Sequence, residues 1–329
     1  MTILLPRRAG RRGGPAAFIR RLASQLTRRG HTITHDTLSP YDVILAPADC
    51  SPWSAFLAKL RRKRVVQRLD GVYHPGLGGR LRYLYALRNL RLRLIRNHLA
   101  DYVIYQSRFA ESICDQMLGA SQTNSSIIYN GVNTAARLVR PASQSEAIQL
   151  ATAAHFRRRD QLLPILAALP HLTIPFTLHI FGSCSDILRP LLTAAARSLN
   201  IIDHGPYAQE EFQSKLSGCD IFLFSDQSAC PNVVLEALSA ALPVVAYDRG
   251  SLPELIEPHI SGELVTLPPH DPLRAVYPFD KTSFRNFARA IQRVAESLRA
   301  YQDAARQRAI NFYDIREKAS QYEDILRPS

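Results

Sequence analysis

The sequence predicts an α/β protein built from two doubly wound, Rossmann-like domains. Its 329 residues, 46% of them hydrophobic and 21% charged, are enough for two domains that each bury a core. Short apolar runs alternate with helical patterns in both halves, as in parallel sheets covered by helices. Residues 133–146 lack periodicity and carry Pro, Ser and Gln. We therefore expect one domain over residues 1–133 and a second over 147–310.

Both halves follow the same order of elements. In the first half we expect strands at 3–5, 32–35, 43–46, 65–69, 102–105 and 127–129, and helices at 15–29, 80–99 and 107–118. In the second half we expect strands at 148–153, 177–181, 201–203, 221–224 and 244–247, with helices between them and after 281. Ligands of such sheets bind beyond the carboxyl ends of the strands, so a cleft between facing halves is the default site.

Charge divides the chain unevenly. Residues 1–120 hold 21 Lys and Arg against 7 Asp and Glu, a net charge of +14, while residues 121–329 have a net charge of −1. The asymmetry indicates a polyanionic or membrane-surface partner for the first domain. The five scattered cysteines predict neither a disulfide framework nor a zinc site, and no apolar stretch is long enough to span a bilayer. We expect a cytoplasmic protein.

The most informative segment is 219–256, which predicts a buried strand, a polar loop and a helix that begins near Pro231 with Ser228 or Cys230 near its cap. The N–H groups of the first helical turn suit a diphosphate, because a helix N-terminus carries partial positive charge and donors without intrahelical partners. These groups belong to Asn232, Val233 and Val234. Glu236, one turn further on, is placed to accept hydrogen bonds from a ribose diol. The alternative is an ordinary βα unit with a surface glutamate.

A resemblance sharpens this interpretation. The sequence CPNVVLEALSAALPVVAYDRGSLPEL, which starts at Cys230, resembles the donor-binding segment of family 4 retaining glycosyltransferases, which have the GT-B fold. Glu236 matches the second glutamate of that family's Glu-x7-Glu pattern. Weaker similarities, all in the family's order, lie at Gly13-Gly14, at Ser107-Arg108-Phe109 and at 129–133. The resemblance implies that a final helix, 311–329, crosses back to the first domain.

Two departures from the family pattern affect the implied donor site. Ser228 stands where the family has its first glutamate, at a catalytic position. His155 and Asp160 stand where the family places an Arg and a Lys that hold the diphosphate. Neighbouring Arg157 and Arg158 are candidates to supply that charge, because Arg binds phosphate in a bidentate manner. The implied donor-binding set is Gly13, Gly14, His155, Arg157, Arg158, Cys230, Asn232, Val233, Val234 and Glu236.

The first domain offers two further candidate sites. Asp70 ends a predicted strand in VVQRLDGVYHP, where the family has a polar active-site residue, so it is a candidate to contact the donor sugar or the acceptor hydroxyl. An N-cap or a salt bridge with Arg68 is the alternative. The Leu- and Arg-rich stretch 80–99 predicts a basic amphipathic helix for an anionic membrane or a phosphorylated acceptor. Leucines packed inward beneath solvated arginines are its alternative. The candidate contact residues here are Arg68, Arg80, Arg88 and Arg91.

The resemblance implies a retaining glycosyltransferase that moves a sugar from a nucleotide diphosphate to an acceptor hydroxyl in polysaccharide, glycolipid or other glycoconjugate biosynthesis. The acceptor is expected to be a sugar, lipid-linked or phosphorylated, and contact with the inner face of a membrane is a further expectation. The chain has no DxD, so we expect no metal, and we expect no cofactor beyond the nucleotide-sugar co-substrate. Nucleic acid is not an expected partner, because no recognition motif accompanies the charge. Two alternatives stay open: an impaired homologue that acts as a binding or scaffold subunit, and a basic polyanion-binding protein.

Overall fold

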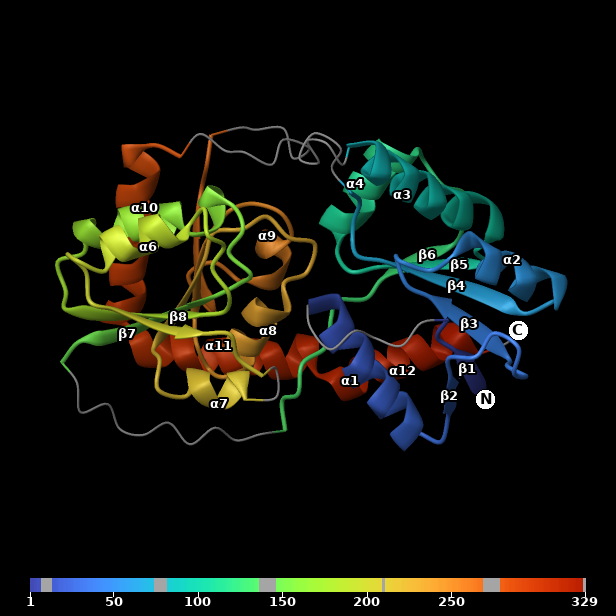
Figure 1. The fold of residues 1–329 in the computed structure, drawn as a ribbon. Helices are drawn as coiled ribbons and strands as arrows, with labels where there is room; N and C mark the ends of the chain where they lie inside the picture. Colours follow the sequence, from blue (N-terminus) through green and yellow to red (C-terminus); the bar gives the residue numbers. More distant parts are fainter. Residues whose placement is uncertain (7–13, 74–81, 136–145, 209–210, 269–278, 328–329) are drawn as a thin grey trace. The chain divides into compact units, whose positions relative to one another are not determined.

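A computed structural model describes residues 1–6, 14–73, 82–135, 146–208, 211–268 and 279–327. Two compact units make up the chain (Figure 1). The first unit is built from the segment Met1–Gly131 and from the C-terminal segment that starts at Tyr313. The second unit is built from the segment that starts at Val132 and ends at Phe312. Each unit is an all-parallel sheet of six strands flanked by helices, which confirms the predicted fold class.

The sheet of the first unit has the strand order β2-β1-β3-β4-β5-β6. Its strands are β1 (Thr2–Leu4), β2 (Thr32–Thr34), β3 (Val43–Ala46), β4 (Arg64–Leu69), β5 (Tyr102–Tyr105) and β6 (Ser125–Ile127). Its helices are α1 (Gly14–Arg28), α2 (Pro52–Leu60), α3 (Arg82–Leu94), α4 (Arg108–Leu118) and α12 (Ile315–Leu326). Helix α2 was missing from the sequence prediction. The predicted helix 80–99 is α3 continued by a π-helical turn, Ile95–Leu99.

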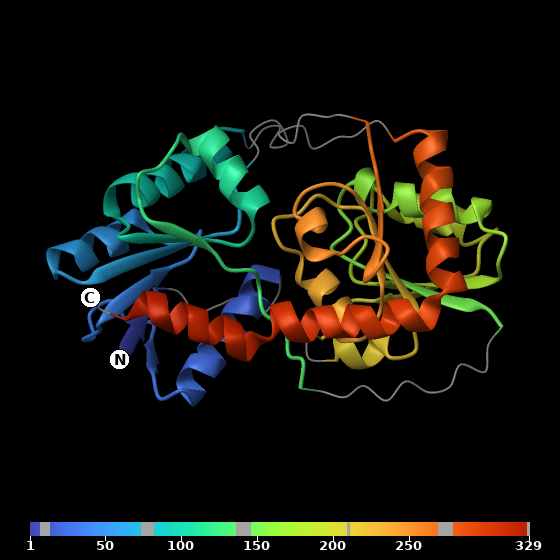
Figure 2. The same cartoon turned by 180° about the vertical axis from the view of Figure 1, so that it is seen from behind.

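Helices cover both faces of this sheet (Figures 1 and 2). On one face, α1 and α12 pack together, and Phe18 and Tyr322 meet with ring centroids 5.9 Å apart. On the other face lie α2, α3 and α4, whose buried residues include Ala55, Leu92 and Cys114. The C-terminal helix α12 therefore belongs to the core of the unit that contains the N-terminus.

The sheet of the second unit has the order β12-β11-β10-β7-β8-β9. Its strands are β7 (Ile148–Ala153), β8 (Phe176–Phe181), β9 (Ile201–Gly205), β10 (Ile221–Phe224), β11 (Val244–Tyr247) and β12 (Gly262–Val265). Its helices are α5 (Leu163–Ala168), α6 (Arg189–Ala195), α7 (Phe212–Leu216), α8 (Asn232–Ser239), α9 (Leu252–Leu255), α10 (Lys281–Glu296) and α11 (Leu298–Tyr313), with 3₁₀ turns at Arg159–Gln161 and Leu169–His171. The edge strand β12 was missing from the prediction.

Each strand order reverses direction at one point. In the first sheet the reversal lies between β1 and β3, and in the second it lies between β7 and β10. In doubly wound sheets, ligands bind outside the carboxyl ends of the strands at such a switch point. In the loop after β1, residues 7–13, which include the predicted residue Gly13, lie outside the described residues. The switch point of the second sheet is fully described.

Among the described residues, no helix combines the length and the apolar character that crossing a bilayer requires.

Candidate functional site

The carboxyl ends of β7 and β10 bring two polar loops together. After β7 the chain runs through His155, Arg157 and Arg158, and after β10 it runs through Asp226 and Ser228. The predicted donor-binding residues of the second unit thus gather at the switch point of its sheet, with α8 beginning directly after the second loop.

Two glycines allow the loops at this edge to approach one another. Gly250, after β11, has a φ of +62°, and a Cβ there would lie 2.8 Å from the carbonyl oxygen of Ser228. The Ser251 N–H donates to that same oxygen at 3.0 Å. Gly182, after β8, has a φ of +121° and abuts the backbone of Ala154. Larger residues at either position would push these loops apart, since both the φ angle and the space require glycine.

The charged groups at the switch point are largely paired with one another. The Arg158 guanidinium donates to Asp226 at 2.6 Å and to Asp160 at 3.0 Å. Gln161 donates to the other oxygen of Asp226 at 2.7 Å. The pKa of Arg158 is raised, because these two carboxylates outweigh the opposing effect of burial. Arg158 is thus held beside two acids, whereas the predicted site left it available for phosphate.

His155 and Arg157 lie differently from Arg158. Both residues are exposed. The His155 ring is hydrogen bonded through Nδ1 to the hydroxyl of Ser183, in the loop after β8. The backbone N–H of Arg157 donates to the Gln161 side chain at 2.7 Å, which fixes the loop while the Arg157 side chain extends into solvent. Of the two predicted arginines, Arg157 is therefore the more accessible cation.

The start of α8 differs in one respect from the prediction. Pro231 is the N-cap residue, with Cys230 directly before it, and no side-chain hydrogen bond caps the helix. The N–H of Val234 donates to the Pro231 carbonyl at 3.1 Å. The expectation that Val234 offers its N–H to a ligand is therefore wrong, because that donor is used inside the first turn. For Asn232 and Val233, contact of the backbone N–H with a diphosphate stays a prediction.

Glu236 points into the protein and not to solvent, since the residue is 1% exposed. Burial, and after it the charge of Glu236, raise the pKa of Tyr207, which follows β9. The Tyr207 ring stacks on Phe212 with centroids 4.4 Å apart. A buried carboxylate beside a half-buried tyrosine excludes the alternative of a surface glutamate. Tyr207 and Asp226 were absent from the sequence prediction; the signal for both was a polar residue two positions after the end of a strand.

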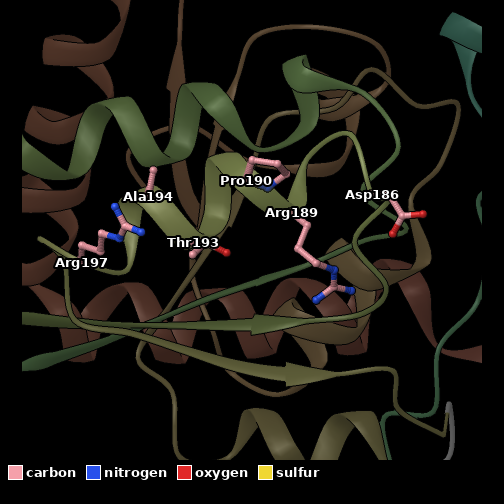
Figure 3. Close-up of a pocket in the computed structure, with 6 residues that line it drawn as sticks. All are labelled: Asp186, Arg189, Pro190, Thr193, Ala194 and Arg197. Atoms are coloured by element: carbon pink, nitrogen blue, oxygen red, sulfur yellow. The ribbon is translucent and has the colours of Figure 1, made fainter.

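A shallow hollow of about 410 Å³ lies over α6, near the loop after β8. Its lining includes Arg189 and Thr193, with Asp186 at one end and Arg197 at the other (Figure 3). None of the predicted site residues lines it.

The candidates in the first unit separate into two groups. Arg68 is 1% exposed, and its guanidinium donates to Asn130 at 2.7 Å and to the Tyr322 hydroxyl at 3.1 Å. The expectation that Arg68 contacts an acceptor or a membrane is wrong, because the side chain is enclosed between β4 and α12. Arg91 is exposed and Arg88 is half-buried against the Tyr73 ring; Arg80 lies outside the described residues.

Asp70 directly follows β4 and is half-buried. Burial raises the pKa of its carboxyl, an effect that the charge of Arg68 offsets only in part. The loop after Asp70 is held by Asn89 of α3, whose side chain accepts from the Tyr73 N–H at 2.9 Å and donates to the Tyr73 carbonyl at 2.7 Å. Asp70 thus stands on a fixed loop at the end of its strand.

Comparison with known proteins agrees with this fold. The model of the family described as glycosyl transferases group 1 matches residues 147–277. Similar solved structures include the Anabaena protein HepE in complex with UDP and glucose, with 16% identity, a TM-score of 0.73 and 99% of both chains covered. Sucrose-phosphate synthase from Thermosynechococcus elongatus shows 16% identity and a TM-score of 0.74, with 98% of this chain and 97% of that chain covered.

A glycosyltransferase from Rickettsia africae gives 16% identity and a TM-score of 0.74, with 99% of this chain and 97% of that chain covered. Among curated proteins, no sequence matches the chain. The chain therefore has the GT-B fold of glycosyltransferases, and the match over its residues 147–277 is to the glycosyl transferases group 1 family.

Proposed function

We propose that this protein is a retaining glycosyltransferase that moves a sugar from a nucleotide diphosphate to an acceptor hydroxyl, in the synthesis of a polysaccharide, glycolipid or other glycoconjugate. The observation that carries the proposal is the second unit's switch point, where the loops after β7 and β10 and the start of α8 meet above a buried Glu236. The match of residues 147–277 to the glycosyl transferases group 1 family supports glycosyl transfer as the reaction class. HepE, whose structure contains UDP, makes UDP the first nucleotide to test.

In this proposal the protein acts mainly through electrostatics. The acceptor oxygen attacks the anomeric carbon from the face that the diphosphate leaves, the glycosidic bond forms as the bond to the phosphate oxygen breaks, and that oxygen takes the acceptor proton. The backbone donors of Asn232 and Val233 and the Arg157 guanidinium stabilise the charge that develops on the diphosphate. Removing one such donor typically lowers the rate ~10²- to 10³-fold. No metal ion is required in this scheme.

The remaining roles follow from position. Glu236 accepts hydrogen bonds from the ribose diol, and Asp70, in the first unit, contacts the donor sugar or the acceptor hydroxyl. Ser228 stands at the catalytic position where the resembling family has a glutamate. The acceptor is a sugar, lipid-linked or phosphorylated, and the basic first unit binds it.

The decisive experiment measures thermal shifts with UDP, GDP, dTDP, ADP and CMP, with and without Mg²⁺. We expect one nucleoside diphosphate to raise the melting temperature equally in both conditions. Glu236→Gln keeps the side-chain volume, so it separates loss of a ribose contact from loss of folding. The native protein should prefer the ribonucleotide over its 2′-deoxy form, and Glu236→Gln should lose that preference. An unchanged preference would refute the role of Glu236.

One observation favours the second candidate, an impaired homologue that binds a nucleotide sugar without turning it over. Arg158 is held by Asp160 and Asp226, and His155 and Ser228 replace residues that the resembling family uses. Release of the nucleoside diphosphate from a nucleotide sugar in the presence of acceptor oligosaccharides or lipids would exclude this candidate. Nucleotide binding without release of product over many hours would support it.

A further inference from the structure

Helix α3 turns its most apolar side to solvent. Tyr83, Leu87, Leu90 and Leu94 are 72%, 46%, 59% and 43% exposed. Their spacing of four, three and four residues places them on one stripe of the helix. The opposite side of α3 is the one that packs, since Asn89 and Leu92 are its buried residues. This arrangement is the reverse of an ordinary surface helix, whose apolar stripe faces the core.

Arginines border this stripe on both sides. Arg91 lies along one flank, and Arg82 and Arg93 lie along the other; all three are exposed. The alternative in which the leucines pack inward beneath solvated arginines holds for Leu92 but not for the stripe. An apolar centre with cations at its margins is the pattern of a helix that lies in a lipid–water interface, where the arginine heads meet anionic headgroups.

Helix α2 adds a second exposed apolar set on the same face of the sheet (Figures 1 and 2). Trp53 and Leu60 are 62% and 64% exposed, and Phe56 is 40% exposed. The rings of Trp53 and Phe56 stack with centroids 5.5 Å apart. The exposed cations Arg61 and Arg62 follow at once in the sequence. Together these residues and the α3 stripe form what we call the α2–α3 surface.

We infer that the α2–α3 surface docks on an anionic lipid bilayer. Residues 52–98, which contain both helices, hold 12 Lys and Arg, of which Arg68 and Arg96 are buried, and one acidic residue, Asp70. A bilayer rich in anionic lipid matches both the apolar and the basic residues of this surface. Its acyl chains bury the leucines and aromatic rings, and its headgroups neutralise the arginines. Trp53 and Tyr83 are of the residue types that favour the headgroup level.

Two other candidate partners, a second copy of the chain and a nucleic acid, match the α2–α3 surface less well. A second copy of the chain would bring the same excess of positive charge against itself across a two-fold interface. A nucleic acid would meet leucines at the centre of the surface, where it needs cations and stacking platforms. Docking on lipid does not depend on sugar transfer, so the two proposals can fail separately.

Trp53 provides the measurement, because it is the only tryptophan of the chain and lies on the proposed surface. The full chain is titrated with vesicles of phosphatidylglycerol and phosphatidylcholine in equal amounts, and with pure phosphatidylcholine vesicles. We expect the Trp53 emission to shift to the blue, and acrylamide quenching to fall, only with the anionic vesicles. Added NaCl should weaken the binding.

Matched variants locate the contact. Leu87→Ser with Leu90→Ser should lower vesicle affinity at least about tenfold, because two half-exposed leucines no longer enter the bilayer. Arg91→Gln should lower it by up to about fivefold, as expected for one arginine near an anionic surface. Ile187→Ser removes an apolar residue of the second unit that is 78% exposed, more than either leucine, and should leave the vesicle affinity unchanged. All variants should keep the melting temperature of the native protein, which shows that they are folded whether or not a nucleotide binds.

Three results would overturn the inference. One is an unchanged Trp53 emission with anionic vesicles at millimolar lipid. A second is vesicle binding that the paired leucine substitutions leave intact, since the contact would then lie elsewhere. The third is a dimer in light scattering that Leu87→Ser with Leu90→Ser dissociates, because the surface would then be covered by another copy of the chain.

Discussion

Two arginines near the carboxyl ends of inner strands, one in each unit, have opposite surroundings. Arg68 of β4 is buried, with the neutral side chains of Asn130 and Tyr322 as its acceptors and the Phe18 ring centroid 4.4 Å from its guanidinium carbon. Arg158, after β7, lies beside the carboxylates of Asp160 and Asp226 and remains partly open to solvent. The first arginine joins a strand to the C-terminal helix, whereas the second belongs to a charged strand edge.

The contrast extends to the two units. In the second unit the basic residues at the switch point are balanced by acids, so the predicted ligand must be held by Arg157, backbone donors and a few polar side chains. In the first unit, nine of the 21 Lys and Arg of residues 1–120 lie on α3 or at 59–64, and none of these nine is buried. The distribution of charge in the sequence therefore predicts the exposed basic surface of the first unit better than it predicts the ligand site of the second unit.

The largest expected effect concerns Arg68. Arg68→Ala should lower the free energy of unfolding by about 3 kcal/mol, because it leaves a cavity and two buried polar partners without their donor. Urea unfolding of the full chain measures it, with Arg91→Ala as the exposed control that should change stability by less than ~0.5 kcal/mol. If Arg68→Ala is as stable as the native protein but no longer binds anionic vesicles, then Arg68 contacts the membrane and is not a structural residue of the interior.

Two single substitutions at the second unit's switch point test whether the exposed Arg157 or the acid-paired Arg158 binds the ligand. Arg157→Gln should weaken nucleoside diphosphate binding about tenfold, which corresponds to ~1.4 kcal/mol, because it removes an accessible charged donor. Arg158→Gln should weaken binding less and lower the melting temperature more, since Asp226 loses its arginine and Asp160 keeps only Arg249, 3.8 Å away. Isothermal titration and thermal unfolding separate the two effects. The opposite order would mean that the two acids present Arg158 to the ligand.

The smallest expected effect is a pH dependence at Asp70. Burial raises its pKa in the folded state above the unfolded value, so the folded protein binds the proton more tightly. Stability should therefore fall as pH rises from the unfolded pKa through the folded pKa. Asp70→Asn should remove this loss and stabilise the protein at neutral pH by less than about 1 kcal/mol, while sugar transfer is lost. Unfolding curves between pH 4 and 8, with the exposed Asp248→Asn as control, measure the difference; a flat difference would contradict the prediction.

Local patterns predicted the inner strands well. Val43–Ala46, Tyr102–Tyr105, Ile221–Phe224 and Val244–Tyr247 begin and end where their apolar runs do, because strands buried on both faces are continuous apolar segments. Edge elements were harder to predict. Strand β12 contains Gly262 and the buried Glu263, which accepts from Arg293 at 2.8 Å and from Tyr301 at 2.6 Å. Those partners lie far along the chain, so no local pattern indicates that this glutamate is inside.

Sequence patterns were sufficient to predict the class of the fold, the division of charge and the segment from Cys230 to Leu255 that carries the family resemblance. These depend on short-range periodicity and composition, which neighbouring residues supply. The folded structure was needed to show that Arg68 is enclosed, that Asp160 and Asp226 hold Arg158, and that Leu87 and Leu90 face outward. A helical pattern records which residues share a face but not which face meets the sheet, because that choice depends on packing against residues distant in the chain.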